Sequence, residues 1–287
     1  MLAGLCLVVL NQCIGTANAL VENTPGEAAA SEGTADILSP GSPNRFAWSP
    51  ITYDSTKQYI YLTFDDGPQP GTMTCYDLCK KENVKASFFM VGLHAALRSD
   101  GKEIVSRIRE SYPQILLANH SYTHARGRYQ DFYKHPAIAE QDFLKAQDSL
   151  HVPFRIVRLP GNSAWDREND QKASWLVKPV THLLDSSGYN VIGWDVEWRF
   201  GHRSGRPVQS AQQMADDVDS AFARNHTHVK NQLVILSHDR MFKRPDDADS
   251  LAKFIAILKN NPRYVLETVD HYPDLKRPVR GIHDHRP

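Results

Sequence analysis

Two adjacent carboxylates and two histidines four residues apart are the side chains of this sequence best suited to chemistry. Asp65 and Asp66 directly follow a hydrophobic run and precede a turn-forming Gly-Pro pair, and His120 and His124 follow a second hydrophobic run. One carboxylate oxygen with two imidazole nitrogens forms a ligand set for a catalytic divalent metal that keeps positions open for water and substrate. We therefore expect Asp66, His120 and His124 to bind a metal, which leaves Asp65 as the general base of a metal-assisted hydrolase. The alternative is that the two aspartates only cap a turn and face solvent.

Further polar residues follow the later hydrophobic runs. Arg158 follows one of these runs, Asp195 and Glu197 end another, and His238 ends a third. Because the carboxyl ends of parallel strands meet at one rim of a barrel, we expect these residues to lie near the two aspartates. Arg158 would orient Asp65 through a bidentate ion pair. His238 is the candidate general acid, with a carboxylate from the fifth run setting its tautomer.

The elements that must position these residues alternate between strands and helices. Short hydrophobic runs predict seven strands, at residues 59–64, 86–91, 114–119, 154–159, 190–195, 232–237 and 264–269. Apolar residues at helical spacing lie between several of these runs, as at Ala139, Phe143, Ala146 and Leu150. The alternation predicts a parallel sheet with right-handed crossovers. Seven strands favour an α/β barrel one unit short of eight, and an open doubly wound sheet is the alternative.

Length and charge favour a single globular domain over residues 49–287. The chain has 287 residues, and its 33 basic and 33 acidic side chains balance. This balance gives no net electric field that would favour binding of nucleic acid, so we expect no nucleic-acid partner. We also expect a monomer. The cysteines Cys75 and Cys79 lie four apart in a predicted helix, which favours packed thiols over a disulfide.

The first 48 residues differ in composition from the rest. An apolar run from Leu2 to Leu10, followed by small residues ending at Ala19, predicts a signal peptide over residues 1–19. A short core helix is the alternative. Residues 20–48 are rich in small and polar residues and predict a flexible leader. We therefore expect an exported protein, periplasmic or extracellular, with no integral membrane segment after signal removal.

Five short motifs occur in a fixed order and carry a family resemblance. They are Phe64-Asp65-Asp66-Gly67-Pro68, His120-Ser-x-x-His124, Arg158-x-Pro160, Asp195-x-Glu197-Trp198 and Leu236-x-His238. Together they resemble the motifs of the polysaccharide deacetylases, the NodB-homology enzymes of carbohydrate esterase family 4. The match covers about residues 55–270. The resemblance implies an α/β fold, a distorted (β/α)7 barrel, and removal of N-acetyl groups from peptidoglycan, chitin or related glycans.

The resemblance also implies roles for single residues. It assigns a divalent metal, Zn²⁺ or else Co²⁺ or a similar ion, to Asp66, His120 and His124. The remaining roles are Asp65 as base, His238 as acid, Arg158 as the partner of the base, and Pro160, Gly161 and Asn162 as substrate-binding residues. Trp194 and Trp198 flank the carboxylate of the fifth run and could form the wall of a sugar-binding site; the alternative is that they belong to the core.

The sequence departs from the family pattern in two of the five motifs. Gly161-Asn162 stands where the family has an aromatic residue and then glycine, which leaves open the amide that stabilises the oxyanion. The fourth motif has Glu197 where the family has aspartate. Asp195 and Glu197 are both candidates to set the tautomer of His238, and we prefer Asp195. Two other functions stay open: hydrolysis of a small non-sugar amide, and non-catalytic glycan binding.

Overall fold

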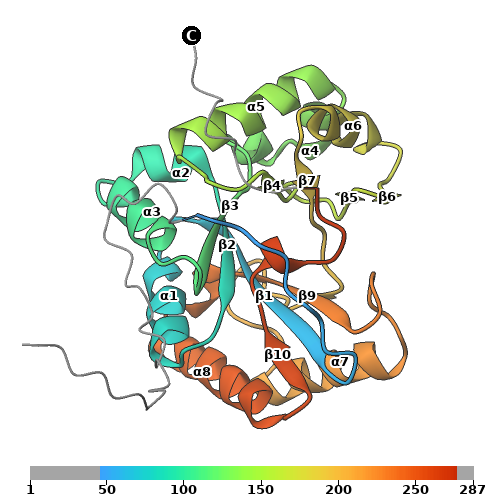
Figure 1. The fold of residues 1–287 in the computed structure, drawn as a ribbon. Coiled ribbons are helices and arrows are strands. Elements are labelled where there is room, and N and C mark those ends of the chain that lie inside the picture. Colours follow the sequence, from blue (N-terminus) through green and yellow to red (C-terminus); the bar gives the residue numbers. More distant parts are fainter. Residues whose placement is uncertain (1–45, 277–287) are drawn as a thin grey trace, which may run out of the picture. The chain divides into compact units, whose positions relative to one another are not determined.

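The computed structural model describes residues 46–276, all of which belong to one compact unit (Figure 1). The predicted signal peptide and most of the predicted leader lie outside the described residues. The strands are β1 Gln58–Gly67, β2 Ala86–Met90, β3 Ile115–Asn119, β4 Ile156–Val157, β5 Trp165–Arg167, β6 Asp170–Lys172, β7 Asn190–Val191, β8 Val196–Glu197, β9 Gln232–His238 and β10 Tyr264–Leu266. The α-helices are α1 Thr72–Lys81, α2 Gly92–Leu97, α3 Gly101–Arg109, α4 Tyr129–Tyr133, α5 Pro136–Ser149, α6 Lys178–Ser186, α7 Ala211–Ala223 and α8 Pro245–Asn260. The short 3-10 helices are η1 His124–Gly127, η2 Asp239–Phe242 and η3 Val269–His271.

Each of the seven predicted runs contains a strand, and the central strands are parallel. The sheet order is β6-β5-β7-β4-β3-β2-β1-β9-β8, with β10 pairing with β1. The antiparallel hairpin of β5 and β6 was not predicted, because residues 165–172 are mostly charged or polar and contain no hydrophobic run.

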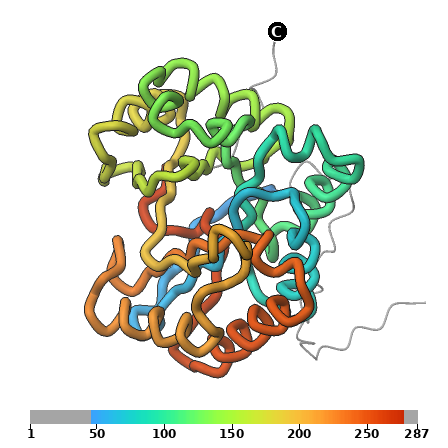
Figure 2. The backbone as a smooth tube through the Cα atoms, turned by 180° about the vertical axis from the view of Figure 1, so that it is seen from behind, coloured from blue at the N-terminus to red at the C-terminus, as the bar shows by residue number. Residues whose placement is uncertain are grey.

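One short segment, residues 190–197, joins the two ends of the parallel part of the sheet. Its first residues pair with β4, at Ile156 and Val157, and its last residues pair with β9, at Ile235 and Leu236. Figure 2 shows this segment in gold, running between the green and the orange parts of the chain. The predicted α/β barrel is therefore confirmed over the open doubly wound sheet. The barrel is distorted because a single segment changes its strand partner along its length.

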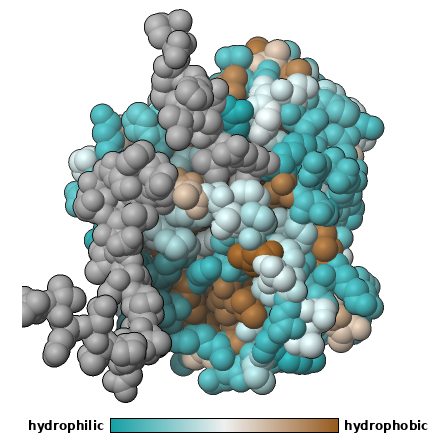
Figure 3. Space-filling model, viewed as in Figure 1, coloured by the Kyte–Doolittle hydropathy of each residue, from teal (hydrophilic) through white to brown (hydrophobic). Residues whose placement is uncertain are grey.

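The core lies on both faces of the sheet. In β1, Ile60, Leu62 and Phe64 pack toward the surrounding helices, whereas Tyr59 and Tyr61 belong to a separate cluster. This is the alternation of a strand that is buried on both sides. The helical stripe predicted in α5, namely Ala139, Phe143, Ala146 and Leu150, is at most 2% exposed. In Figure 3 most of the coloured surface is hydrophilic, around a smaller hydrophobic patch.

Two smaller predictions concern the cysteines and the leader. Cys75 and Cys79 are buried free thiols, and burial raises the pKa of Cys79 to about 12. Phe46 and Trp48 pack against a core cluster, and the Trp48 indole donates a hydrogen bond of 2.8 Å to the Asp270 carbonyl. The described chain therefore contacts the core a few residues before the predicted leader end at residue 48. Within residues 46–276, no helix has the length and apolarity needed to cross a membrane.

Candidate metal and catalytic centre

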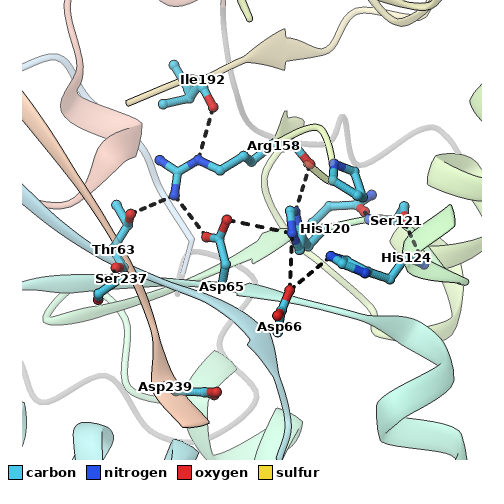
Figure 4. Close-up of polar contacts among 12 residues, drawn as sticks. Thr63, Asp65, Asp66, His120, Ser121, His124, Arg158, Ile192, Ser237 and Asp239 are labelled. Carbon is cyan, nitrogen blue, oxygen red and sulfur yellow. Dashed lines mark hydrogen bonds and ion pairs between the residues drawn. The ribbon is translucent and has the colours of Figure 1, made fainter. Parts of the chain in front are cut away.

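A bulge at the end of β1 turns the two adjacent aspartates toward the same site. Asp65 pairs with Phe89 of β2 and Gly67 pairs with Met90, so the register shifts across Asp66, whose φ is 76°. Neighbouring side chains of a regular strand point to opposite faces, and a bulge changes the direction of one of them. As a result, His120 Nε2 lies 3.6 Å from Asp65 Oδ2 and 3.5 Å from Asp66 Oδ1 (Figure 4).

The three predicted metal ligands lie together. Asp66 Oδ1 is 3.0 Å from His124 Nε2, and the ligand atoms of Asp66, His120 and His124 all lie within 4.8 Å of one another. The two histidines follow β3 in a turn, in which Ser121 and His124 have φ values of 67° and 51°. Within the described part of the chain, Asp66 Oδ1 is buried without a hydrogen-bond partner. A buried oxygen without a partner that faces two imidazole nitrogens fits a divalent metal.

Backbone carbonyls hold two imidazoles at this centre. The His120 Nδ1–H donates to the Arg158 carbonyl at 2.9 Å, which directs Nε2 toward the aspartates. His94, for which the sequence indicates no catalytic role, places Nδ1 2.6 Å from the Asp66 carbonyl. Burial lowers the pKa of His120, but the charges of Asp65 and Asp66 outweigh burial and raise the pKa overall. The same negative charge would stabilise a metal cation.

Asp65 is held by a fully buried arginine. Arg158 Nη1 donates to Asp65 Oδ1 at 2.8 Å and to Thr63 Oγ1 at 2.6 Å. Its Nε donates to the Ile192 carbonyl at 3.2 Å, and its Nη2 donates to the Gly193 carbonyl at 2.9 Å. The predicted pairing is therefore present, but through one hydrogen bond instead of the expected bidentate pair. The second oxygen of Asp65 is left on the side of His120.

These residues line one cavity of about 600 Å³ at the rim of the barrel. Its lining comprises Asp65, Asp66, Gln69, His94, His120, His124, Tyr129, Leu159, Gly161, Trp194, Glu197, Phe200, His202, Leu236, His238 and Arg240. His238 is partly exposed in the cavity, and its Nδ1 is buried without a hydrogen-bond partner among the described residues. The structure thus brings the proposed base, the ligands and the proposed acid into one cavity.

The structure separates Asp195 from Glu197, the two candidate carboxylates for setting the tautomer of His238. Asp195 accepts hydrogen bonds from the backbone N–H groups of His228, at 2.6 Å, and Val234, at 2.8 Å, and it lines a different pocket. Glu197 lies beside Leu236 in the β8–β9 register and lines the same cavity as His238. The preference for Asp195 is therefore not supported, because both of its oxygens accept hydrogen bonds from backbone amides away from His238.

Only some of the predicted substrate-binding residues line the catalytic cavity. Trp198 is fully buried, and its indole donates to the Gln209 carbonyl at 2.9 Å, so its assignment to substrate is wrong and Trp198 belongs to the core. Pro160 is buried, and its carbonyl accepts the Tyr133 hydroxyl at 2.7 Å. Among the predicted residues of the third motif, Gly161 lines the cavity, whereas Pro160 and Asn162 do not belong to its described lining.

Tyr129 is a cavity residue outside the five motifs, in a loop whose aromatic and basic residues the sequence offers as possible sugar contacts. A Cβ atom added to Gly161, whose φ is 64°, would lie 2.9 Å from the Tyr129 ring. The same ring meets His124 edge to face, with centroids 5.7 Å apart. Tyr129 therefore packs against both a predicted metal ligand and the glycine that replaces the aromatic residue of the family motif.

Asp239 is a second group that the motifs do not identify, although it directly follows His238. It is fully buried and accepts hydrogen bonds from the Thr72 hydroxyl and, at 2.7 Å, from the Gln69 amide. Burial raises the pKa of Asp239 to about 8. These contacts fix the turn that follows Asp66, and Figure 4 shows Asp239 below the two aspartates.

Comparisons with known proteins match this chain to one family. A family model described as polysaccharide deacetylase matches residues 52–174. A chitin disaccharide deacetylase of Vibrio alginolyticus is 26% identical over 76% of this chain and 72% of its own length. A peptidoglycan-N-acetylglucosamine deacetylase of Bacillus cereus is 27% identical over 80% of this chain and 75% of its own length.

Solved structures extend the likeness to the fold. A chitin deacetylase from Colletotrichum lindemuthianum has a TM-score of 0.58 at 19% identity and covers 83% of this chain and 98% of its own. The catalytic domain of a peptidoglycan N-acetylglucosamine deacetylase from Eubacterium rectale has a TM-score of 0.56 at 23% identity, covering 82% and 99%. Residues 52–174, which contain the first three motifs, match the polysaccharide deacetylase family of hydrolases, and the NodB-like fold continues through the rest of the described chain.

Proposed function

We propose that this protein is a metal-dependent hydrolase that removes N-acetyl groups from an amino-sugar polymer, such as peptidoglycan, chitin or a related glycan. One observation carries the proposal. The ligand atoms of Asp66, His120 and His124 lie within 4.8 Å of one another in a cavity that also contains Asp65 and His238. A ligand set, a base and an acid around one cavity are the parts that amide hydrolysis needs.

Asp66, His120 and His124 would hold the metal, for which Zn²⁺ suits one carboxylate and two imidazoles and Co²⁺ is the alternative. When bound, such a metal polarises a carbonyl oxygen and lowers the pKa of water. The carbonyl at Arg158 would keep His120 in the tautomer with Nε2 free, because Nδ1–H donates to it at 2.9 Å.

Asp65 would take a proton from the attacking water, held in place by the hydrogen bond of 2.8 Å from Arg158. His238, which is the register partner of Asp65 on the neighbouring strand β9, would donate a proton to the leaving nitrogen. We assign Glu197 as the carboxylate that orients His238, since it lines the same cavity beside Leu236.

The test is acetate release from chitooligosaccharides, peptidoglycan and a small non-sugar amide, before and after treatment with a chelator. We expect release from at least one glycan, loss of release after chelation, and recovery on adding Zn²⁺ or Co²⁺. Acetate release from the small amide alone would instead indicate a hydrolase of small non-sugar amides. Glycan binding without any acetate release would point to a binding module.

We also propose that residues 1–19 are removed and that the protein is exported as a monomer. The apolar run and the small residues ending at Ala19 support export. N-terminal sequencing of protein from its own host should begin near Leu20. An intact Met1 in soluble cytoplasm would contradict export.

A further inference from the structure

Residues 90–94, which we call the bridging segment, end β2 and begin α2 beside the bulge that carries Asp66. The Val91 N–H donates a hydrogen bond of 2.7 Å to the carbonyl of Gly67, the residue after Asp66. His94 Nδ1 lies 2.6 Å from the carbonyl oxygen of Asp66 itself. A carbonyl oxygen only accepts hydrogen bonds, so Nδ1 of His94 is the protonated nitrogen and the donor. The bridging segment therefore holds two consecutive carbonyls of the bulge.

The same segment also holds the turn that carries the two histidines. The Gly92 N–H donates to the Ser121 carbonyl at 3.1 Å. The Leu93 N–H donates to the carbonyl of the next residue, Tyr122, at 2.7 Å. Gly92 permits this close approach, because an added Cβ atom would lie 2.3 Å from the Tyr122 ring. In the opposite direction, the His120 N–H donates to the carbonyl of the last residue of β2 at 2.9 Å. One short segment is thus hydrogen-bonded to both parts of the chain that carry the proposed ligands.

Both parts have backbone conformations that need support from their surroundings. Asp66, Ser121 and His124 are not glycines, yet their φ values are 76°, 67° and 51°. L-residues rarely adopt this left-handed region, and surrounding contacts must keep them there. In a regular strand the Asp66 side chain would point away from the face that Asp65 occupies. Figure 4 shows instead that the Asp66 carboxylate faces both imidazoles. The hydrogen bond from His94 acts on the carbonyl of this same residue.

We propose that His94 is a positioning residue of the metal centre, which raises the metal affinity by holding Asp66 in its left-handed conformation. This inference rests on the proposed function, of which it uses only the metal ligands. The His94 ring is half-buried, lines the catalytic cavity and lies 6.5 Å from the His124 ring between centroids. Among the described residues, the ligand atoms within 4.8 Å of one another belong to Asp66, His120 and His124 and do not include His94. We therefore assign His94 no bond to the metal.

The experiment measures the dissociation constant of Zn²⁺ by competition with a colorimetric chelator, using the full chain after its metal has been removed. Wild type is compared with His94→Ala and His94→Asn. Alanine removes the donor to the Asp66 carbonyl, so we expect the dissociation constant to rise about 10–100-fold, as for other groups that orient a metal ligand. Asparagine places an amide N–H near the position of Nδ1 and has no counterpart of Nε2, so we expect a value within about threefold of wild type.

His135→Ala is the matched control. The Nδ1–H of His135 also donates to a backbone carbonyl, that of Asp131 at 2.9 Å, but this histidine is exposed and outside the described lining of the catalytic cavity. Its removal should leave the dissociation constant of Zn²⁺ unchanged. Urea unfolding of each metal-free protein establishes that the variants are folded under the conditions of the titration.

Co²⁺ absorption spectra distinguish a positioning residue from an additional ligand. A positioning role leaves the ligand set unchanged, so the spectrum of Co²⁺-loaded His94→Asn should match that of wild type. Equal Zn²⁺ affinity in His94→Ala and wild type, or equal losses of affinity in His94→Ala and His94→Asn, would overturn the inference. Wild type that binds neither Zn²⁺ nor Co²⁺ would refute the metal-dependent function, and the inference with it. Wild type that binds Zn²⁺ but releases no acetate from any glycan would refute the proposed function alone.

Discussion

The pair formed by Asp65 and Arg158 should show strong energetic coupling in a double-mutant cycle. Arg158 is fully buried and Asp65 is 2% exposed, so water cannot fully replace the partner of either charge. Arg158→Met removes the guanidinium and leaves the Asp65 carboxylate buried. Asp65→Asn removes the negative charge and keeps an oxygen that accepts from Arg158. The double variant has neither charge.

The structure sets the expected size of this coupling. The N–O distance of 2.8 Å places the two charge centres about 4 Å apart, which gives about 4 kcal/mol at an effective dielectric constant of about 20. Breaking a buried pair by removing one partner typically costs about 3–5 kcal/mol. Arg158→Met also leaves the Ile192 and Gly193 carbonyls without their donor, at about 1–3 kcal/mol each. We therefore expect the double variant to be about 2–4 kcal/mol more stable than the two single changes predict by addition.

Urea unfolding of all four proteins in the presence of a chelator measures this coupling. The chelator is needed because a metal that binds only the folded state adds its own stabilisation, which would differ among the variants. The repulsion between Asp65 and Asp66 cancels in the cycle, since it is present with and without Arg158. Additivity within about 0.5 kcal/mol would refute the reasoning that this pair is electrostatically coupled.

Three other predictions follow from single residues. Asp66→Ala should lose both metal and activity, whereas Asp65→Asn should keep metal by elemental analysis and lose about 10²–10⁴-fold in acetate release; the reverse pattern would exchange their roles. Gly161→Ala should lower the free energy of unfolding by about 1–3 kcal/mol, from strain at φ 64° and the clash with the Tyr129 ring, and Tyr129→Ala in that background should remove only the clash. Burial raises the pKa of Glu267, but hydrogen bonds from His271, Lys85 and Thr268 outweigh it and hold the pKa at about 2 instead of 4.5. The ionised Glu267 carboxylate therefore adds at most about 3 kcal/mol to the free energy of unfolding above pH 4.5, and this contribution is lost as pH falls toward 2. Glu267→Gln should flatten the dependence of the free energy of unfolding on pH in this range, as measured by urea unfolding.

The chain positions of the chemical groups could be predicted from the sequence because they follow hydrophobic runs. Asp66 and His120 come within two residues of the ends of such runs, His124 lies four residues beyond His120, and parallel strands bring their carboxyl ends together. The bulge that turns Asp65 and Asp66 toward the same site has no comparable signal, since it depends on the register between β1 and β2.

The segment of residues 190–197 shows why the rest could not be predicted. In a regular strand Trp194 and Trp198 would share a face, because side chains alternate with a period of two. In the structure Trp194 lines the cavity and Trp198 is in the core. The period fails because the segment leaves β4 after Val191 and joins β9 at Val196, and a change of register moves side chains to the other face.

The bulge at Asp66 allows two neighbouring residues, the proposed base and a proposed metal ligand, to face the same site. One rigid peptide unit holds their Cα atoms about 3.8 Å apart, so a movement of the β1 end carries both carboxylates together. Other residues that line the catalytic cavity come instead from α4, as Tyr129 does, and from the chain between β8 and α7, as Phe200 and His202 do. Sequence changes in those parts can therefore reshape the glycan that is accepted while the spacing of the reacting groups stays constant. In this fold the residues that select the substrate can therefore change in evolution without a change in the catalytic residues.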